Sequence, residues 1–241
     1  MEFLFNTPAL IHKDALIIAD THFGIEKKLA GKGIADSDFS VRLALQIESL
    51  LKAHKNRVKK IILLGDVKEE IFSLDAPTRR ILDRLAGDTE ILITKGNHDG
   101  GIESFSNAKV FGSGGFVYEG LGLFHGHAWP NPELMMCDFI LCGHEHPAIK
   151  FIDSFGGSHL EPVWTISVPQ KIKIKKFYKN FNENIRLILV PSFNPLQGLP
   201  LNERRKSGFG IMFDNKLFKA TDTLVFRLDG TPVGRLKDLK S

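Results

Sequence analysis

The chain has 241 residues, of which 43% are hydrophobic and 25% charged, and it carries a formal net charge of +4 at pH 7. This composition is typical of a soluble globular protein, and the length suits one domain over residues 1–241. No apolar run approaches the roughly 18 residues of a membrane span, and no basic segment precedes the N-terminal apolar stretch, so we expect a cytoplasmic protein. Cys137 and Cys142 form no CxxC pair, which argues against a disulfide scaffold and a thiolate metal site.

Residues 1–147 alternate short apolar runs with helical patterns, which indicates an α/β layered fold. The runs are too short for helices and too uniformly apolar for surface strands, so we interpret them as central strands. They cover residues 15–19, 61–64, 91–94, 121–124 and 139–142.

Three helices are expected between these strands. The first follows Ser37, with Ser37 or Asp38 as its N-cap. Its predicted apolar stripe contains Val41, Ala44, Leu45 and Leu51. A second helix is predicted from Ala76 to Ala86, and a short third one from Pro132, behind Asn131.

From about residue 148 the pattern changes to strand-like alternation with turn residues. Strands are predicted over 165–177, 185–190, 209–213 and 223–228, and Asp229-Gly230 predicts a hairpin to a last strand at 232–236. The segment 191–208 is rich in Pro, Asn and Gly and ends in a basic cluster, Arg204, Arg205 and Lys206. We expect a long loop there, and loops of that length are often functional.

Polar side chains follow each of the five apolar runs. The motifs are Asp20-Thr21-His22, Gly65-Asp66, Gly96-Asn97-His98-Asp99, His125-Gly126-His127 and Gly143-His144-Glu145-His146. Ligands gather at the carboxyl ends of strands in open α/β sheets, so we expect these groups to converge on one crevice. Six of the nine histidines fall within the motifs, which makes an accidental arrangement improbable. The glycines suit tight turns where the backbone passes close to a ligand.

This ordered set, D-x-H, GD, GNHD, HGH and GHxH, resembles the signature of the calcineurin-like metallophosphoesterase superfamily. The resemblance covers about residues 15–147. It implies a four-layer α/β/β/α sandwich, in which helices flank two mixed sheets. Residues 1–147 would form the core that carries the metal motifs, and residues 148–241 would add second-sheet strands and a basic extension. It also implies a metal-dependent hydrolase of phosphate esters.

The resemblance also implies a ligand set for two divalent cations. Carried over position by position, one metal would be held by Asp20, His22 and His146, the other by Asn97, His125 and His144, with Asp66 bridging the two. Oxygen and imidazole ligands without thiolate suit Mn²⁺, with Zn²⁺ or Fe as alternatives. Two such cations would activate a water molecule for attack on the phosphorus atom.

Other residues of the motifs are expected to act on the substrate. His98 would donate a proton to the leaving alkoxide or stabilise the phosphoryl oxygens, and Asp99 would orient its ring. After Asp66 the chain departs from the wider pattern, because Val67-Lys68-Glu69-Glu70 follows. Lys68 is either a phosphate-facing charge or a solvated lysine. For His127 we favour a substrate-facing or metal-supporting role.

The second half of the chain suggests a polyanionic substrate. Residues 1–147 hold 16 basic and 20 acidic residues, a net −4, whereas residues 148–241 hold 16 and 8, a net +8. In a strand, Lys171, Lys173 and Lys175 would share one face and could bind a phosphate backbone. The PSFNPLQG run at 191–198 resembles predicted phosphoesterases that include ligase-associated DNA-damage-response endonucleases. We therefore hypothesise a phosphodiesterase or nuclease acting on DNA or RNA.

Two other functions are compatible with the sequence. The same metal centre would serve a phosphodiesterase of small cyclic nucleotides. A non-catalytic interaction scaffold is the third reading, as in the retromer subunit of this superfamily, although such members have lost the catalytic His that His98 retains here. Apolar strand edges in the second half are compatible with a homodimer, and no membrane association is expected.

Overall fold

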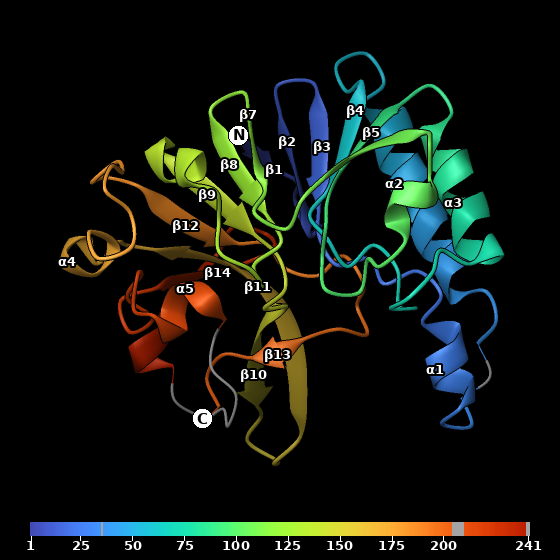
Figure 1. Cartoon of the computed structure of the whole chain (residues 1–241). Helices are drawn as coiled ribbons and strands as arrows, with labels where there is room; N and C mark the ends of the chain where they lie inside the picture. Colours follow the sequence, from blue (N-terminus) through green and yellow to red (C-terminus); the bar gives the residue numbers. More distant parts are fainter. Residues whose placement is uncertain (35, 204–209, 240–241) are drawn as a thin grey trace.

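Two β-sheets form the centre of the computed structural model, which describes residues 1–34, 36–203 and 210–239 (Figure 1). The first sheet has the order β1-β2-β3-β4-β5-β6. Its strands are β1 Glu2–Phe3, β2 Ala9–His12, β3 Ala15–Ile18, β4 Lys60–Leu63, β5 Glu90–Thr94 and β6 Ala108–Phe111. Strands β3 to β6 are parallel, and β1 and β2 add an antiparallel edge.

The second sheet has the order β13-β10-β11-β12-β9-β8-β7, and β14 and β15 extend it from β11. Its strands are β7 Phe116–Tyr118, β8 Leu121–Phe124, β9 Phe139–Cys142, β10 Pro147–Ile152, β11 Ser158–Ser167, β12 Arg186–Leu189, β13 Leu199–Pro200, β14 Leu224–Arg227 and β15 Pro232–Arg235. Strands β8, β9 and β12 are parallel, so their carboxyl ends lie at one edge. Three strands of this sheet, β7 to β9, precede residue 147.

Helices cover the outer face of each sheet. On the first sheet these are α2 (Phe39–Ala53) and α3 (Ala76–Ala86); on the second they are α4 (Lys171–Ile174), α5 (Ile211–Asp214) and the 3₁₀ helix η2 (Pro132–Met136). Short helices α1 (Glu26–Ala30), η1 (Ile102–Ser104) and η3 (Leu236–Asp238) complete the elements described.

Strand β3 shows how the layers form. Leu16 and Ile18 pack with the core under α2 and α3, whereas Ile17 and the following Ala19 pack against the second sheet, as the two-residue period of a strand requires. The expected α/β/β/α order is confirmed.

The elements of the first half agree closely with prediction. Strands β8 and β9 and helix α3 have the predicted bounds, and η2 begins at Pro132. The predicted apolar stripe of α2 is wrong in part, because Val41 and Leu45 are 38% and 48% exposed. The residues of this helix that are buried are Ser40, Leu43, Ala44 and Ile47.

The predicted strand over residues 165–177 is correct for residues 165–167 and wrong beyond Ser167. Strand β11 ends at Ser167, and helix α4 begins at Lys171, where the amides of Lys173 and Ile174 bond to the carbonyl of Gln170. Pro169 lies between the two elements and has no N–H for a sheet ladder. The helical turn buries Ile174 and leaves Ile172 79% exposed, although a strand would place both on one face.

Three more predictions fall in the second half. The predicted strand over 209–213 is wrong, because Ile211–Asp214 form helix α5, while Phe209 lies outside the described residues. The hairpin at Asp229-Gly230 is confirmed by the pairing of β14 with β15. In the predicted loop 191–208, residues 199–200 form β13, and the basic cluster Arg204, Arg205 and Lys206 lies outside the described residues.

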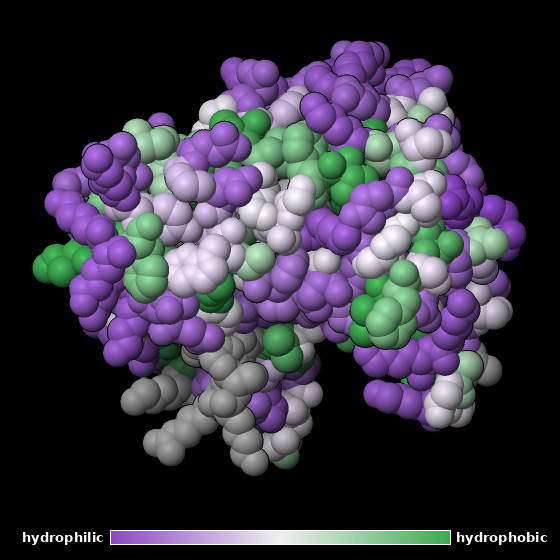
Figure 2. All heavy atoms as spheres, viewed as in Figure 1, coloured by the Kyte–Doolittle hydropathy of each residue, from purple (hydrophilic) through white to green (hydrophobic). Residues whose placement is uncertain are grey.

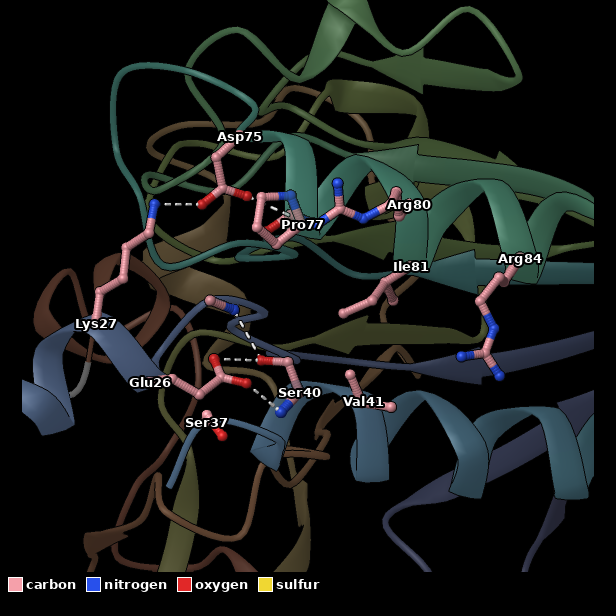
Figure 3. A pocket seen from close by; sticks show the side chains of 12 residues that line it. Glu26, Lys27, Ser37, Ser40, Val41, Asp75, Pro77, Arg80, Ile81 and Arg84 are labelled. Carbon is pink, nitrogen blue, oxygen red and sulfur yellow. Dashed lines mark hydrogen bonds and ion pairs between the residues drawn. The ribbon is translucent and has the colours of Figure 1, made fainter. Parts of the chain in front are cut away.

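The outer surface is mostly hydrophilic over α2 and α3 (Figure 2). None of the helices in the described ranges combines the length and apolarity that a bilayer crossing needs. A pocket of about 340 Å³ lies between α1, α2 and α3 (Figure 3), where Lys27 pairs with Asp75 at 2.6 Å and Ser40 donates to Glu26 at 2.7 Å. None of its lining residues belongs to the strand-end motifs.

Candidate metal centre

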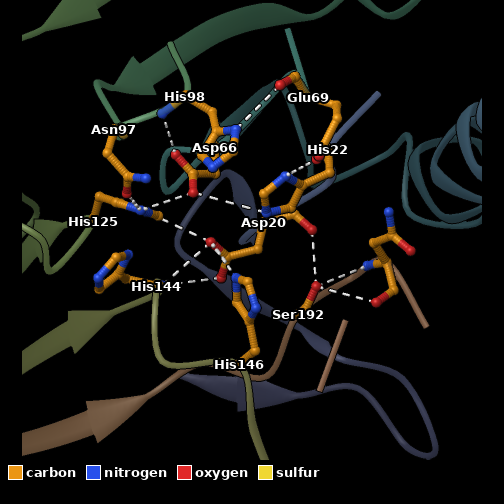
Figure 4. A network of polar contacts seen from close by, with 12 residues as sticks. Asp20, His22, Asp66, Glu69, Asn97, His98, His125, His144, His146 and Ser192 are labelled. Atoms are coloured by element: carbon orange, nitrogen blue, oxygen red, sulfur yellow. Dashed lines mark hydrogen bonds and ion pairs between the residues drawn. The ribbon is translucent and has the colours of Figure 1, made fainter. Parts of the chain in front are cut away.

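The polar motifs that follow β3, β4, β5, β8 and β9 meet at the carboxyl ends of these strands (Figure 4). Three groups of possible ligand atoms result among the described residues, each with all its atoms within 4.8 Å of one another. The first group is Asp20, His22, Asp66 and His146, and the second is Asp66, His125 and His144. His22, Glu69 and His98 form a third group beside them. Asp66 is the residue that the first and second groups share, which is the arrangement that a bridging ligand requires.

In the first group, two imidazoles face the two carboxylates. His146 Nε2 lies 3.3 Å from Asp20 Oδ1, and His22 Nε2 lies 3.7 Å from Asp66 Oδ2. Both Nε2 atoms are buried without a hydrogen-bond partner in the described part of the chain. Buried polar atoms are normally satisfied, so these two nitrogens fit a cation that accepts their lone pairs.

In the second group, a hydrogen bond to the backbone orients the ring of His125. Its Nδ1 donates to the carbonyl of Leu64 at 2.8 Å, which turns Nε2 toward Asp66 Oδ2 at 3.3 Å and Asn97 Oδ1 at 3.2 Å. Fixing one ring nitrogen by a hydrogen bond to a carbonyl is the usual support of a metal-binding histidine. Asn97 Oδ1 therefore lies beside the second group, and its role as a ligand stays a prediction.

The side chains of the centre perturb one another's protonation. Burial favours the neutral imidazole of His125 and alone would lower its pKa. The carboxylates of Asp66 and Asp20 outweigh burial and raise the pKa of His125 to about 9. Burial and the neighbouring His125 lower the pKa of His144 to about 4. Although burial disfavours its charged form, the bond from His125 keeps the pKa of Asp66 below its ordinary value. The buried carboxylate of Asp66 therefore keeps negative charge in the centre, which divalent cations would compensate.

The backbone of the centre is strained. Five of the nine non-glycine residues with positive φ in the described ranges are predicted ligands: Asp20, His22, Asp66, His144 and His146. Their φ angles of 42° to 67° are sparsely populated by residues with a Cβ atom. Strain of this kind clusters at functional sites, where the surrounding structure holds it in place.

Two glycines allow the loops to approach each other. A Cβ atom at Gly96 would lie 2.2 Å from the backbone nitrogen of Asp66, and one at Gly65 would lie 2.5 Å from the ring of His125. Neither position tolerates a side chain without moving a predicted ligand. This agrees with the close backbone approach expected at both glycines.

Glu69 is a part of the centre that the sequence did not predict. Its Oε2 atom accepts from His22 Nδ1 at 2.8 Å, and its Oε1 atom accepts from Lys28 at 2.7 Å. Burial alone would raise the pKa of the Glu69 carboxyl group, but His22 and Lys28 outweigh burial and lower this pKa to about 2. The ionised carboxylate fixes the His22 ring with Nε2 toward Asp66. Glu69, which belongs to the segment that departs from the family pattern after Asp66, therefore supports the predicted ligand His22 through a hydrogen bond.

The 191–198 segment also supports the centre in a way not foreseen. Ser192 Oγ donates to the carbonyl of Asp20 at 2.9 Å, and Asn194 Nδ2 donates to the carbonyl of Thr21 at 3.1 Å. Both side chains are buried. The segment therefore fixes the strained backbone that carries Asp20.

His98 lies beside the centre, but Asp99 does not orient its ring. The His98 amide donates to Asp66 Oδ1 at 2.8 Å, and its ring Nδ1 donates to the carbonyl of Glu69 at 3.1 Å. Asp99 is buried and accepts from the amides of Val67 and Gly96, at 2.9 and 2.8 Å. The predicted contact of Asp99 with the His98 ring is wrong, because the carboxylate joins the two loops that carry Asp66 and Asn97.

Lys68 fits neither of its two predicted readings. Its side chain is fully buried, and its ammonium donates to the carbonyls of Glu70, Ile71 and His98. An ammonium has three N–H groups, so none is left for a phosphate. Lys68 instead ties the 69–72 loop to the loop of His98.

The remaining predicted residues lie at different places. The His127 ring centroid is 5.2 Å from that of His125 and 6.1 Å from that of His144, and its Nδ1 is buried without a partner in the described ranges. Lys171, Lys173 and Lys175 lie on or directly after α4, at the outer side of the second sheet (Figure 1), and Lys171 and Lys175 pair with Glu183. The three lysines do not form the row that a strand would give.

A match to a protein-family model agrees with this geometry. The family model of calcineurin-like phosphoesterases matches residues 14–229. A nuclease from Pseudomonas putida, MPE, is similar in structure with a TM-score of 0.53 and 19% identity, covering 95% of this chain and 94% of that chain. A conserved protein of Streptococcus pneumoniae TIGR4, described as a predicted phosphoesterase, gives a TM-score of 0.30 and 12% identity, covering 92% and 94%. No curated protein matches. The chain belongs to the calcineurin-like phosphoesterase family and is a metal-dependent phosphoric ester hydrolase.

Proposed function

We propose that this phosphoesterase is a nuclease, which hydrolyses phosphodiester bonds of DNA or RNA with two divalent cations, of which Mn²⁺ is the first candidate. The observation that carries the proposal is the carboxylate of Asp66, which lies within ligand distance of the first and second groups of side chains. A bridging carboxylate holds two cations at the spacing of about 3.5–4 Å that in-line displacement uses.

The roles of the side chains follow from their positions. Asp20, His22 and His146 would hold one cation and Asn97, His125 and His144 the other, with Asp66 shared. When bound, the cations would neutralise phosphate charge and lower the pKa of a water molecule. His98 bonds through Nδ1 to the Glu69 carbonyl, so its Nε2 is the ring nitrogen left to protonate the leaving oxygen.

A nucleic-acid substrate is supported by two observations. The structurally similar Pseudomonas putida protein is a nuclease, and the chain shares its fold over 95% of its length. Residues 148–241 carry a net charge of +8, which attracts a polyanion. A homodimer stays a prediction, which light scattering would test.

Hydrolysis by metal-reconstituted protein tests the proposal. Purified chain would be loaded in turn with Mn²⁺, Zn²⁺, Mg²⁺ or Fe²⁺ and assayed on an aryl phosphodiester, a cyclic dinucleotide and a single-stranded oligonucleotide. We expect cleavage of the aryl diester and the oligonucleotide, lost in Asp66→Asn and kept in Asp88→Asn, an exposed surface carboxylate. No hydrolysis with any metal would refute the proposal and favour a scaffold; a preference for the cyclic dinucleotide would refute the nuclease assignment.

A further inference from the structure

Two aromatic rings lie exposed and in contact outside the metal centre. Trp129 and Phe177 are 39% and 48% exposed, and their ring centroids are 4.7 Å apart with an interplanar angle of 32°. Over α4, at the left edge of Figure 2, apolar groups lie exposed among hydrophilic ones. Large aromatic side chains usually bury their surface, and adjacent exposed rings mark a contact surface.

Hydrogen bonds fix the residues next to Trp129 and Phe177 in the sequence. The buried Tyr178 follows Phe177, and its hydroxyl donates to the carbonyl of Pro130 at 2.9 Å. Asn131 bonds on the other side, through its amide to Gly114 at 2.8 Å and through Nδ2 to Gly115 at 2.8 Å. Both Trp129 and Phe177 thus sit next to fixed residues, so a ligand would pay little entropy to order them.

Trp129 is close in sequence to the residues of the metal centre. His127, whose ring lies 5.2 Å from that of the predicted ligand His125, is two residues before Trp129. Two residues of extended chain span at most about 7 Å. The Nδ1 atom of His127 is buried without a partner in the described ranges. The backbone of Trp129 therefore lies within about 7 Å of that of His127, and the Trp129 ring contacts Phe177.

The sequence on both sides of Phe177 is basic. Lys171 and Lys175 are paired with Glu183, whereas Lys173, Lys176 and Lys179 have no ion pair among the described residues. Unpaired ammonium groups next to exposed rings are the combination by which proteins bind single-stranded nucleic acid, because the rings stack on bases while the charges follow the backbone.

We propose that Trp129 and Phe177 form a stacking platform for a base of a single-stranded nucleic acid whose scissile phosphate lies at the metal centre. The inference rests on the proposed nuclease function and narrows its substrate to a single strand with unpaired bases. A base in a duplex is already stacked on its neighbours and would not reach the rings.

Fluorescence separates stacking from charge attraction. Of the two tryptophans, Trp164 is buried, so quenching by a stacked base would report on Trp129. The metal-loaded protein would be titrated with a single-stranded phosphorothioate oligonucleotide and with an abasic strand of equal length and charge. We expect quenching by the first alone, and no quenching in Trp129→Phe, which keeps a stacking ring but leaves only Trp164. Equal quenching by the abasic strand would overturn the platform.

Kinetics give a second readout. We expect Trp129→Ala to raise KM for a single-stranded oligonucleotide about tenfold more than for methyl aryl phosphate, because the variant loses the ring on which a base would stack. Phe177→Ala should act in the same direction and keeps the test open if Trp129→Ala fails to fold. The control is Phe155→Ala, an exposed ring of the β10–β11 turn. Equal losses on both substrates would overturn the platform, whereas wild-type cleavage of the aryl ester without cleavage of any oligonucleotide would overturn the nuclease function itself.

Discussion

His22 Nδ1 donates to Glu69 Oε2 at 2.8 Å, across 47 residues of sequence, so a carboxylate decides which nitrogen of a predicted ligand faces Asp66. Replacing Glu69 with Gln removes the charge that holds this ring. We expect the affinity for the first cation to fall about 10–100-fold, as is usual for supporting carboxylates of this kind. Calorimetric metal titration measures it.

The matched control is the neighbouring Glu70→Gln, because Glu70 is exposed and contacts no predicted ligand with its carboxylate. Equal metal affinities in the Glu69 and Glu70 variants would show that the carboxylate does not support the site.

His98→Gln should separate catalysis from metal binding. His98 is the proposed general acid and is not one of the seven proposed metal ligands, so we expect the metal content of the variant to equal that of the wild type. Turnover should fall by about 10²–10⁴, the usual contribution of a positioned acid. Metal analysis and steady-state kinetics on an aryl diester measure both, with the exposed His159→Gln as control. Loss of metal together with activity would instead place His98 among the ligands.

Lys68→Met should destabilise the fold. The substitution leaves the carbonyls of Glu70, Ile71 and His98 without their buried donor. An unsatisfied buried group costs about 1–3 kcal/mol, so the free energy of unfolding should fall by at least that amount. Urea denaturation measures the change, and Lys52→Met, at an exposed position of α2, should stay near wild type. Equal stabilities would contradict the assigned contacts.

Tyr178 should make stability fall at alkaline pH. Burial raises the pKa of Tyr178 to about 12, whereas an unfolded tyrosine titrates near 10. The folded state therefore holds the phenolic proton more tightly, and this contribution is lost as pH rises from about 10 to about 12. Denaturation at about pH 8 and about pH 11 should show a smaller loss of stability in Tyr178→Phe than in wild type. Identical losses would mean that Tyr178 titrates normally.

The central strands and the strand-end motifs could be predicted because both follow from local pattern. A uniformly apolar run such as Ile61–Leu64 identifies a buried parallel strand, and parallel strands place whatever follows them at one edge. The convergence of Asp20, Asp66 and His144 therefore follows from the order of the motifs.

Partners that depend on distant chain segments could not be predicted. Glu69 stands in a run of charges typical of a solvated loop, and only the fold brings it to His22. The alternation of Lys and Ile after Gln170 predicts a strand, but Pro169 ends the ladder and the burial of Ile174 favours a helical turn. Likewise, Val41 and Leu45 are apolar but face solvent, because tertiary packing selects Leu43 and Ile47.

Anomalous diffraction from crystals grown with Mn²⁺ tests the central claim most directly. Two peaks about 3.5–4 Å apart, with Asp66 between them, are the predicted result. A matched crystal of Asp66→Asn should lose at least one peak. A single peak in the wild-type protein, or two peaks without Asp66 between them, would contradict the binuclear centre.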